Sequence, residues 1–334
     1  MSEVFGEFEG RPVHRVRISN DRLTADILTW GAVVQDLRLD GHPYPLTLGF
    51  ETFEPYPTES PYFGSVPGRV ANRIRNARAP LDGRIIELEP NTPGGHQLHG
   101  GPRGFGKSLW SIVDHGPAHV TLEIVSPDGD MGYPGTLTAR CTYRLASGTL
   151  RCEFEAEADA PTFANLTHHS YFNLEDGGRT AVTDHRLRMA ASAYLDIDED
   201  FVSQGDPIPV EGTRFDFRTM RSIRMGDGEQ PIWDHNLCLS DTHVPMRDVA
   251  WVEAPSSGVS MTVSTTEPGL QFYTGHRIAT RTSGLEGIAY GPRSGLCLEP
   301  QCWPDAPNNP SYPSIEVRPD RPITQIVAYS FLRT

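Results

Sequence analysis

The 334-residue chain lacks any run of about 18 apolar residues, the length that a membrane-spanning helix requires. Its N-terminus also lacks a basic segment followed by an apolar one, so we expect no secretory signal and no membrane partner. Cysteine is scarce: Cys141, Cys152, Cys238, Cys297 and Cys302 are odd in number and form no CxxC pair. This usage is typical of reduced thiols, so we expect a cytoplasmic protein.

Basic side chains are outnumbered by acidic ones. The chain has 29 Lys and Arg against 43 Asp and Glu, which gives a net charge of −14. A surface of this sign is repelled by the phosphates of nucleic acids and by anionic membranes. We therefore expect no nucleic-acid partner.

Helical periodicity over a dozen residues is also missing, whereas apolar and polar residues often alternate. Alternation in Val120–Ile124, Leu137–Leu145 and Leu150–Ala156 predicts antiparallel strands, the last two joined by a short turn that contains glycine. Further strands are predicted at His185–Met189, Val259–Val263, Leu270–Tyr273, Leu296–Leu298 and Ile323–Phe331, and after a hairpin turn at Asp82-Gly83. The pattern indicates an all-β protein, a large antiparallel β-sandwich with few short helices, in one domain over residues 1–334.

Long loops rich in polar and aromatic residues connect the predicted strands. They cover Glu51–Gly64, Glu89–Lys107, Asp196–Phe215 and Pro300–Pro313. Loops on a rigid β scaffold commonly carry binding and catalytic residues. We therefore expect the functional site among these loops.

One motif points to a different class of protein. Gly101–Ser108, GPRGFGKS, satisfies the phosphate-binding pattern GxxxxGK[ST]. That mechanism requires a buried strand before the loop and a helix directly after it. Here a turn precedes the motif and Leu109–Ile124 has a β pattern, so the context argues against a nucleoside triphosphatase.

Other residues suggest acid–base chemistry without establishing it. His168 and His169 are adjacent, and histidine gains or loses a proton near neutral pH, but such a pair is also compatible with structural hydrogen bonding. Glu299 ends an apolar strand, where a carboxylate is costly to bury without a partner. The HQLH sequence, His96 to His99, suggests zinc, but it is not HExxH on a helix and no cysteine pair accompanies it.

Seven segments, read together, resemble the aldose 1-epimerases, or galactose mutarotases, in order and rough spacing. They are GRVANRI, LHGGPRGFGKSLW, GYPGTL, NLTHHSYFNL, WDHNLCL, PGLQFYTGH and LEPQCWPDAPN. The resemblance runs from about Phe5 to the C-terminus. It implies a galactose mutarotase-like supersandwich and an isomerase that interconverts the α and β anomers of free aldoses such as glucose or galactose. It also implies a small-molecule aldose partner, no cofactor and no metal.

The resemblance also assigns roles. Glu299 matches the general base of the family, His169 the general acid, and His99 the second active-site histidine. The residues that match positions holding sugar hydroxyls are Asn72, Arg73, Asp234 and Gln271. His168 and His276 stand where asparagine is frequent and receive no role. Trp303 or a loop tyrosine is expected to cover an apolar face of the sugar.

Attraction between opposite charges is expected to lower the pKa of Glu299, raise that of His169 and give a bell-shaped pH–rate profile. Two other functions remain as alternatives to a mutarotase of free aldoses: a non-catalytic carbohydrate-binding β-sandwich and a hexose-6-phosphate 1-epimerase. The arginines that suggest phosphate binding are Arg69, Arg73, Arg75 and Arg78. A monomer is expected, with a homodimer as the alternative.

Overall fold

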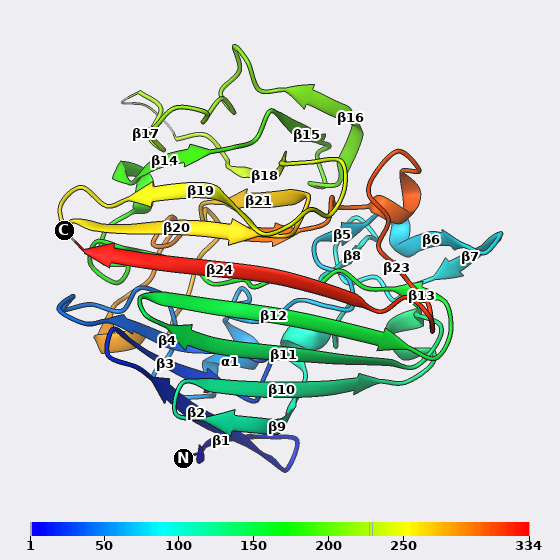
Figure 1. Cartoon of the computed structure of the whole chain (residues 1–334), viewed down its shortest axis with the longest axis horizontal. Helices are drawn as coiled ribbons and strands as arrows, with labels where there is room; N and C mark the ends of the chain where they lie inside the picture. The colour runs from blue at the N-terminus through cyan, green and yellow to red at the C-terminus, as the bar shows by residue number, and fades with distance from the viewer. Residues whose placement is uncertain (1, 227, 229, 334) are drawn as a thin grey trace.

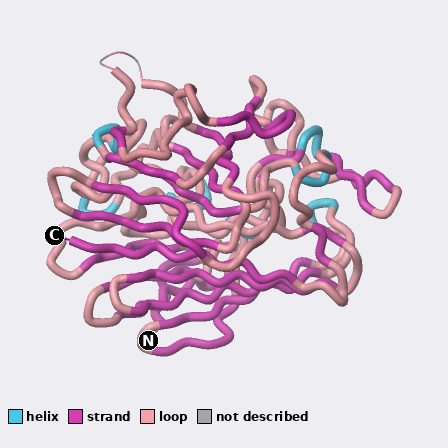
Figure 2. The backbone as a smooth tube through the Cα atoms, turned by 45° about the horizontal axis from the view of Figure 1, so that its top comes forward, coloured by secondary structure: helices cyan, strands magenta, loops and turns pink. Residues whose placement is uncertain are grey.

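The computed structural model describes residues 2–226, 228 and 230–333. Strands predominate in this part of the chain, and helical turns are few and short (Figure 2). The helical elements are α1 (Pro55–Thr58) and the 3₁₀ turns η1 (Arg75–Ala77), η2 (Phe105–Lys107), η3 (Asp130–Gly132), η4 (Val182–Asp184), η5 (Leu285–Gly287) and η6 (Ala306–Asn308). The all-β prediction is confirmed, and none of the helices in the described residues could cross a membrane.

A nine-stranded antiparallel sheet forms one layer of the molecule. Its order is β17 (Arg221–Ser222), β14 (Arg186–Met189), β19 (Arg247–Glu253), β20 (Val259–Thr265), β24 (Ile323–Arg333), β12 (Thr149–Ala158), β11 (Leu137–Ala146), β10 (His119–Ser126) and β9 (Ser111–Gly116). Figure 1 shows the C-terminal strand β24, in red, running between β12 and β20. Strands far apart in the sequence are therefore neighbours in this sheet.

The smaller sheets are also antiparallel. One has the order β1 (Ser2–Phe8), β2 (Arg11–Ser19), β3 (Leu23–Leu28), β4 (Val34–Leu39), and another β16 (Ser203–Pro209), β15 (Ala193–Ile197), β18 (Asp234–Cys238), β21 (Gly269–Tyr273), β22 (Cys297–Gln301). The two-stranded pairs are β13 (Thr162–Phe163) with β23 (Glu316–Val317), β5 (Arg73–Ile74) with β8 (Gln97–Leu98), and β6 (Arg78–Leu81) with β7 (Arg84–Glu87). All the strand segments predicted by alternation, and the hairpin at Asp82-Gly83, are present.

Several strands differ from the sequence-based expectation. Strands outside the predicted set include β1 to β4, β9, β15, β18 and β19. The predicted loop Glu89–Lys107 contains β8, and the predicted loop Asp196–Phe215 contains β16. Gly205, Pro207 and Pro209 hide this strand from a propensity argument. Such residues are tolerated because β16 is the edge strand of its sheet. Proline has no N–H to donate, and an edge strand has one side that needs no hydrogen bonds to a neighbouring strand.

The phosphate-loop reading is rejected by the fold. Phe105–Lys107 forms a single 3₁₀ turn, and the next element is the strand β9. No helix N-terminus follows Lys107 to bind phosphate, as the motif requires.

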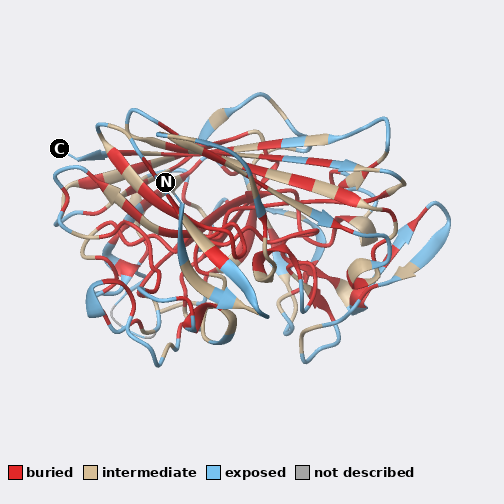
Figure 3. Cartoon of the chain, turned by 90° about the horizontal axis from the view of Figure 1, so that it is seen from below, coloured by how far each residue is buried: buried red, intermediate tan, exposed pale blue. Residues whose placement is uncertain are grey.

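The main core lies between the nine-stranded sheet and the two next-largest sheets. It joins Leu122 and Phe154 of the large sheet to Ile27 of β3 and to Leu270 and Phe272 of β21. Figure 3 shows buried residues between the layers and exposed residues along the outer loops. Because side chains alternate along a strand, the residues between these core positions in β21 face away from the core. That second face of the five-stranded sheet carries polar groups.

Candidate active site

Three neighbouring strands place acidic and amide side chains side by side. Asn236 of β18 lies opposite Gln271 of β21, which lies opposite Glu299 of β22. Two residues along these strands, and hence on the same face of the sheet, Asp234 lies opposite Tyr273. Directly opposed residues in antiparallel strands project from the same face of the sheet. The register therefore brings together carboxyl and amide groups that are up to 65 positions apart in the sequence.

His169 reaches the same place from a segment between strands. Its backbone N–H donates to the carbonyl of Ser65 at 2.9 Å, and its carbonyl accepts from the N–H of Gly64 at 3.1 Å. These two bonds hold the segment against the Glu51–Gly64 loop, at a depth where the imidazole is only 5% exposed. The histidine is thus positioned by contacts between two loops.

His168 faces the other way. It is fully buried; its Nε2 lies 2.7 Å from the hydroxyl of Ser170 and its Nδ1 lies 3.4 Å from that of Tyr143. Tyr143 belongs to β11 and to the main core. Burial lowers the pKa of His168 to about 3, so it is a neutral core residue with hydroxyl partners.

His99 and Asn72 are joined by two hydrogen bonds. The His99 N–H donates to the Asn72 carbonyl at 2.9 Å, and the Asn72 N–H donates to His99 Nδ1 at 3.1 Å. Nδ1 is therefore an acceptor without a proton, and in the neutral ring Nε2 carries the proton. Burial, helped by His169 and Arg73, holds the pKa of His99 well below its usual value. His99 thus offers a neutral N–H donor.

These side chains surround a cavity of about 170 Å³. Its lining consists of Pro61, Tyr62, Asn72, Arg73, Leu98, His99, His169, Tyr171, Asp234, Gln271, Tyr273, Arg277 and Glu299. All seven site residues expected from the sequence are in that set. Its volume and its polar walls suit one monosaccharide.

His169 and Glu299 form a close pair in this cavity. His169 Nε2 lies 3.5 Å from Glu299 Oε2, and the glutamate is 2% exposed. The expectation that mutual attraction sets their pKa values is wrong for the free protein. Burial raises the pKa of Glu299 well above its usual value, with a further contribution from Asp234, and burial lowers that of His169 to about 3. Removal from water outweighs attraction between the charges because both groups are enclosed.

The other polar side chains of the cavity use only some of their hydrogen-bonding atoms within the protein. Gln271 Nε2 donates to Asp234 Oδ1 at 2.7 Å, which leaves the other carboxylate oxygen for a ligand. Arg73 is buried and its Nε has no hydrogen-bond partner among the described residues. Burial lowers the pKa of Arg73, while the Asp234 carboxylate raises it. A buried donor without a partner is costly, so Arg73 is suited to bind an oxygen-rich ligand.

Tyrosines, and not Trp303, form the aromatic wall. Tyr62 and Tyr171 each stack on the His169 ring, with ring centroids 5.9 and 5.1 Å away. Trp303 lies outside the cavity, where its ring packs on Tyr312 and its Nε1 donates to a backbone carbonyl. The tryptophan part of the expectation is therefore wrong. Tyr171 could have been found, because it follows His169 by two residues and so shares its side of an extended segment.

Two other histidines remain outside the cavity. His96 Nδ1 accepts the N–H of Asn76 at 2.8 Å, and its Nε2 lies 3.3 Å from Asp200. His276 packs its ring on Tyr273 and Phe201. Because His96 and His99 each give Nδ1 to a different backbone N–H, the HQLH sequence does not act as a pair of zinc ligands.

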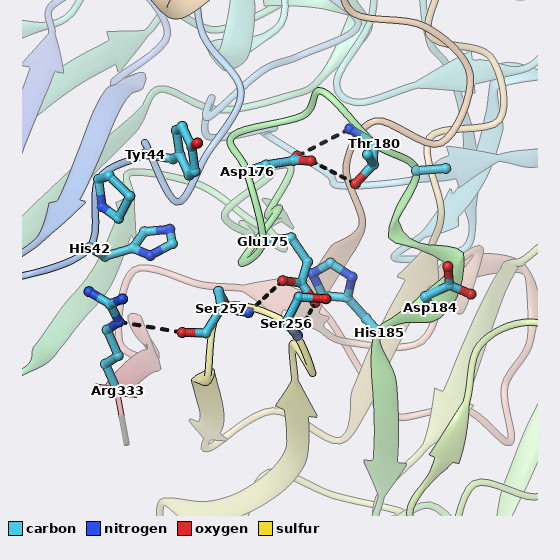
Figure 4. A pocket seen from close by; sticks show the side chains of 12 residues that line it. His42, Tyr44, Glu175, Asp176, Thr180, Asp184, His185, Ser256, Ser257 and Arg333 are labelled. Carbon is cyan, nitrogen blue, oxygen red and sulfur yellow. Dashed lines mark hydrogen bonds between the residues drawn. The ribbon is translucent and has the colours of Figure 1, made fainter.

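A larger hollow of about 510 Å³ lies elsewhere in the molecule (Figure 4). Two of its acidic side chains, unlike Glu299, are hydrogen-bonded to the backbone. Its Glu175 accepts the backbone N–H groups of Ser256 and Ser257 at 2.9 and 2.7 Å. Its Asp176 is likewise bound to the N–H and hydroxyl of Thr180. These carboxylates stabilise turns, so this hollow lacks the free acid–base pair of the smaller cavity.

A β-sandwich with a small cavity and a buried carboxyl–imidazole pair is suited to general acid–base chemistry on a small molecule. Comparison with known proteins agrees. The family model described as aldose 1-epimerase matches residues 14–330. The galactose mutarotase of Rattus norvegicus is 40% identical over 98% of this chain and 97% of its own length. The aldose 1-epimerase of Escherichia coli is 34% identical over 97% and 96%.

Solved structures show the same fold. An aldose epimerase homologue from C. elegans has a TM-score of 0.88 at 29% identity and covers 96% of this chain and 99% of its own. Galactose 1-epimerase from Lactobacillus acidophilus has a TM-score of 0.83 at 25% identity and covers 99% and 98%. The chain belongs to the aldose 1-epimerase family, and the resemblance and the supersandwich fold expected from the sequence are confirmed.

Proposed function

We propose that this enzyme interconverts the α and β anomers of a free aldose such as galactose or glucose, with Glu299 as general base and His169 as general acid. One observation carries the assignment: a carboxyl oxygen and an imidazole nitrogen 3.5 Å apart line a cavity of monosaccharide size. The anomers of an aldose differ only at C1 and interconvert through the open-chain aldehyde. The reaction therefore needs one proton acceptor and one donor and consumes neither.

Ring opening transfers two protons. Glu299 takes the proton of the C1 hydroxyl as the bond between C1 and the ring oxygen breaks, and His169 gives its proton to that oxygen. Rotation about the C1–C2 bond presents the other face of the aldehyde, and the same two groups return the protons as the ring closes. Each positioned acid or base contributes roughly 10²–10⁴-fold to the rate.

The pair needs one proton in total. Carboxylate with imidazolium and carboxylic acid with imidazole have the same net charge and differ only in where that proton lies. Burial favours the neutral arrangement, whereas the Arg73 guanidinium lowers the pKa of Glu299 and favours the ionised one. A bound sugar brings hydroxyl groups that hydrogen-bond to both charges, so binding stabilises the reactive arrangement.

The other cavity residues orient the sugar. The His99 Nε2–H and the Arg73 guanidinium donate to sugar oxygens, and the Asn72 amide adds a further donor. The free oxygen of Asp234 accepts from a hydroxyl, and Gln271 holds Asp234 in place. Such positioning lowers the entropy cost of bringing C1 to Glu299 and the ring oxygen to His169.

Phosphorylated hexoses fit these walls less well than free ones. Arg69 uses its guanidinium on backbone carbonyls and on the Ser126 and Thr162 hydroxyls. Arg75 pairs with Asp198 at 2.8 Å and Arg78 with Glu87 at 2.8 Å. Of the four arginines that suggested phosphate binding, only Arg73 lines the cavity. Arg277 is a further guanidinium there, so glucose and its 6-phosphate should be compared directly.

The decisive experiment is polarimetry with freshly dissolved α-D-galactose and α-D-glucose. The enzyme is expected to speed the approach to anomeric equilibrium, and Glu299→Gln to remove nearly all of that acceleration. A wild-type rate equal to that of buffer contradicts the proposal. Sugar binding without acceleration identifies a non-catalytic carbohydrate-binding protein instead.

Assembly and compartment belong to the same proposal. We place the enzyme in the cytoplasm as a single-domain monomer that works without a cofactor or metal. All five cysteines are free thiols, which suits a reducing compartment. Sedimentation of the purified chain distinguishes a monomer from a homodimer.

A further inference from the structure

A thiol lies beside the acid–base pair, and the proposed reaction does not use it. Cys297 precedes Glu299 by two residues on β22, so both side chains project from the same face of the strand. Ligand atoms of Cys297, Glu299 and His169 all lie within 4.8 Å of one another. In the described residues, no other group of three histidine, cysteine or acidic side chains comes together in this way.

The three groups are the ligand types that zinc prefers, and the site can contract to fit it. Zinc bonds of about 2.0–2.3 Å in a tetrahedron put neighbouring ligand atoms roughly 3.3–3.7 Å apart, so movements of about 1 Å are required. His169 Nδ1 has no hydrogen-bond partner among the described residues. No bond therefore fixes the tautomer of this buried ring, and the form with Nε2 free to bind a metal is accessible.

Charge also favours a divalent ion at this position. A dication compensates one thiolate and one carboxylate, which makes the buried cluster neutral. The Cys297 proton and the single proton of the Glu299–His169 pair then leave to solvent.

We propose that Cys297, Glu299 and His169 form an inhibitory binding site for zinc(II) and similar divalent ions at the wall of the sugar cavity, which Glu299 and His169 line. The ion holds the base and the acid and therefore competes with the sugar. This ion is an inhibitor and not a cofactor, so a chelator raises the rate of a metal-exposed sample. The binding site stands on geometry, whereas the inhibition rests on the proposed function.

Cobalt(II) provides a direct test of binding. It accepts the same tetrahedral ligands as zinc, and a cobalt–thiolate bond absorbs in the near ultraviolet. Full-length protein freed of metal is expected to bind one equivalent of cobalt with this absorption, which zinc displaces and galactose suppresses. Cys297→Ser is expected to remove the absorption, while Cys302→Ser, at another fully buried thiol, keeps it.

Polarimetry tests the inhibition. Zinc is expected to raise the apparent KM for galactose without lowering kcat, and the chelator EDTA to reverse the effect. Cys297→Ser is expected to raise the zinc inhibition constant at least about tenfold, since one of three ligands is lost. Circular dichroism checks that this variant folds. If it does not, cobalt titration of Glu299→Gln replaces it, because that change also removes a ligand.

The outcomes separate the two hypotheses. Absence of the thiolate absorption in wild-type protein, or zinc inhibition equally strong in the Cys297 variant, overturns the metal site. The same holds if zinc lowers kcat and leaves KM unchanged. Cobalt–thiolate absorption in a protein that accelerates no anomerisation instead keeps the site and rejects the proposed function.

Discussion

Two buried glutamates of this protein differ in the hydrogen-bond partners of their carboxyl groups. Glu267, between β20 and β21, is fully buried, and its carboxylate accepts from Gln325 at 2.7 Å and from the Thr266 hydroxyl at 3.1 Å, with His243 3.3 Å away. Glu299 is almost as deeply buried, but the polar partner of its carboxyl group in the described residues is the His169 imidazole, at the longer distance of 3.5 Å.

This difference distinguishes a glutamate that stabilises the fold from one that is available for a reaction. Buried polar groups usually have hydrogen-bond partners, so a buried carboxyl group without donors is an exception that needs a reason. The Glu267 cluster has a structural one: Gln325 also accepts the N–H of Leu166 at 2.8 Å, which ties β24 to the segment leading to His169. Glu299 instead has free lone pairs on the wall of a cavity. The cluster at Glu267 supports the site, and the site itself is left incomplete for a ligand.

The largest expected effect is the loss of the base. Glu299→Gln keeps the side-chain volume but removes proton acceptance, so kcat is expected to fall roughly 10²–10⁴-fold. Thermal unfolding should show an unchanged or higher Tm, because a buried acidic group with few partners is replaced by a neutral amide. A large fall in Tm would mean that Glu299 is as structural as Glu267.

The adjacent histidines allow the same comparison one residue apart. His169→Asn is expected to lower kcat roughly 10²–10⁴-fold through loss of the acid. His168→Asn is expected to keep kcat within a few-fold and to lower the free energy of unfolding by about 1–3 kcal/mol, because Ser170 and Tyr143 lose a partner. Polarimetry and urea denaturation of both variants provide the two measurements. Equal losses of activity would remove the distinction between them.

Removal of the other glutamate is expected to affect stability. Glu267→Ala removes one of the two acceptors of the Gln325 amide and the acceptor of the Thr266 hydroxyl, and it is expected to cost about 1–3 kcal/mol of folding free energy. The folded fraction should retain kcat, since Glu267 does not line the cavity. Urea denaturation followed by circular dichroism measures the loss, and kcat is normalised to folded protein. A kcat defect like that of Glu299→Gln would contradict the separation of roles.

A smaller effect is expected at the sugar-binding wall. Asp234→Asn keeps an acceptor for Gln271 but weakens the bond to a sugar hydroxyl, so KM is expected to rise about tenfold with a smaller change in kcat. Asp241→Asn is the matched control because Asp241 is an exposed aspartate close in sequence. Initial rates over a range of galactose concentrations separate KM from kcat. A change confined to kcat would place Asp234 in the chemical step instead.

The smallest expected effect is that of pH near neutrality. The active pair holds one proton: it gains a second at the lowered pKa of His169, about 3, and loses its only one at the raised pKa of Glu299. Activity should therefore fall on the acidic side near the lowered pKa of His169 and on the alkaline side at the raised pKa of Glu299. An acidic limb near pH 6.5, the ordinary value of histidine, would mean that burial does not set the pKa of His169.

Much of the fold follows from local pattern. Alternation in Leu137–Leu145 and Leu150–Ala156 predicts two strands because one face of each is buried against the core. β16 was not predictable in this way, since an edge strand can contain glycine and proline without a buried alternating face. The site residues were expected from the family resemblance. For the aromatic wall the sequence offered Trp303 or an unspecified loop tyrosine, and it did not single out Tyr62, which approaches the cavity through loop conformation.

The sequence by itself determined the class of fold, the family and the residue types available for proton transfer. The family resemblance assigned the acid to His169, but alternation along an extended segment implies only that adjacent side chains face opposite ways. Tertiary structure supplies the physical reason, because it brings Tyr143 to the His168 ring and Glu299 to the His169 ring. It also reversed the expected pKa shifts of the pair, because the cost of removing a charge from water depends on what the whole fold packs around it.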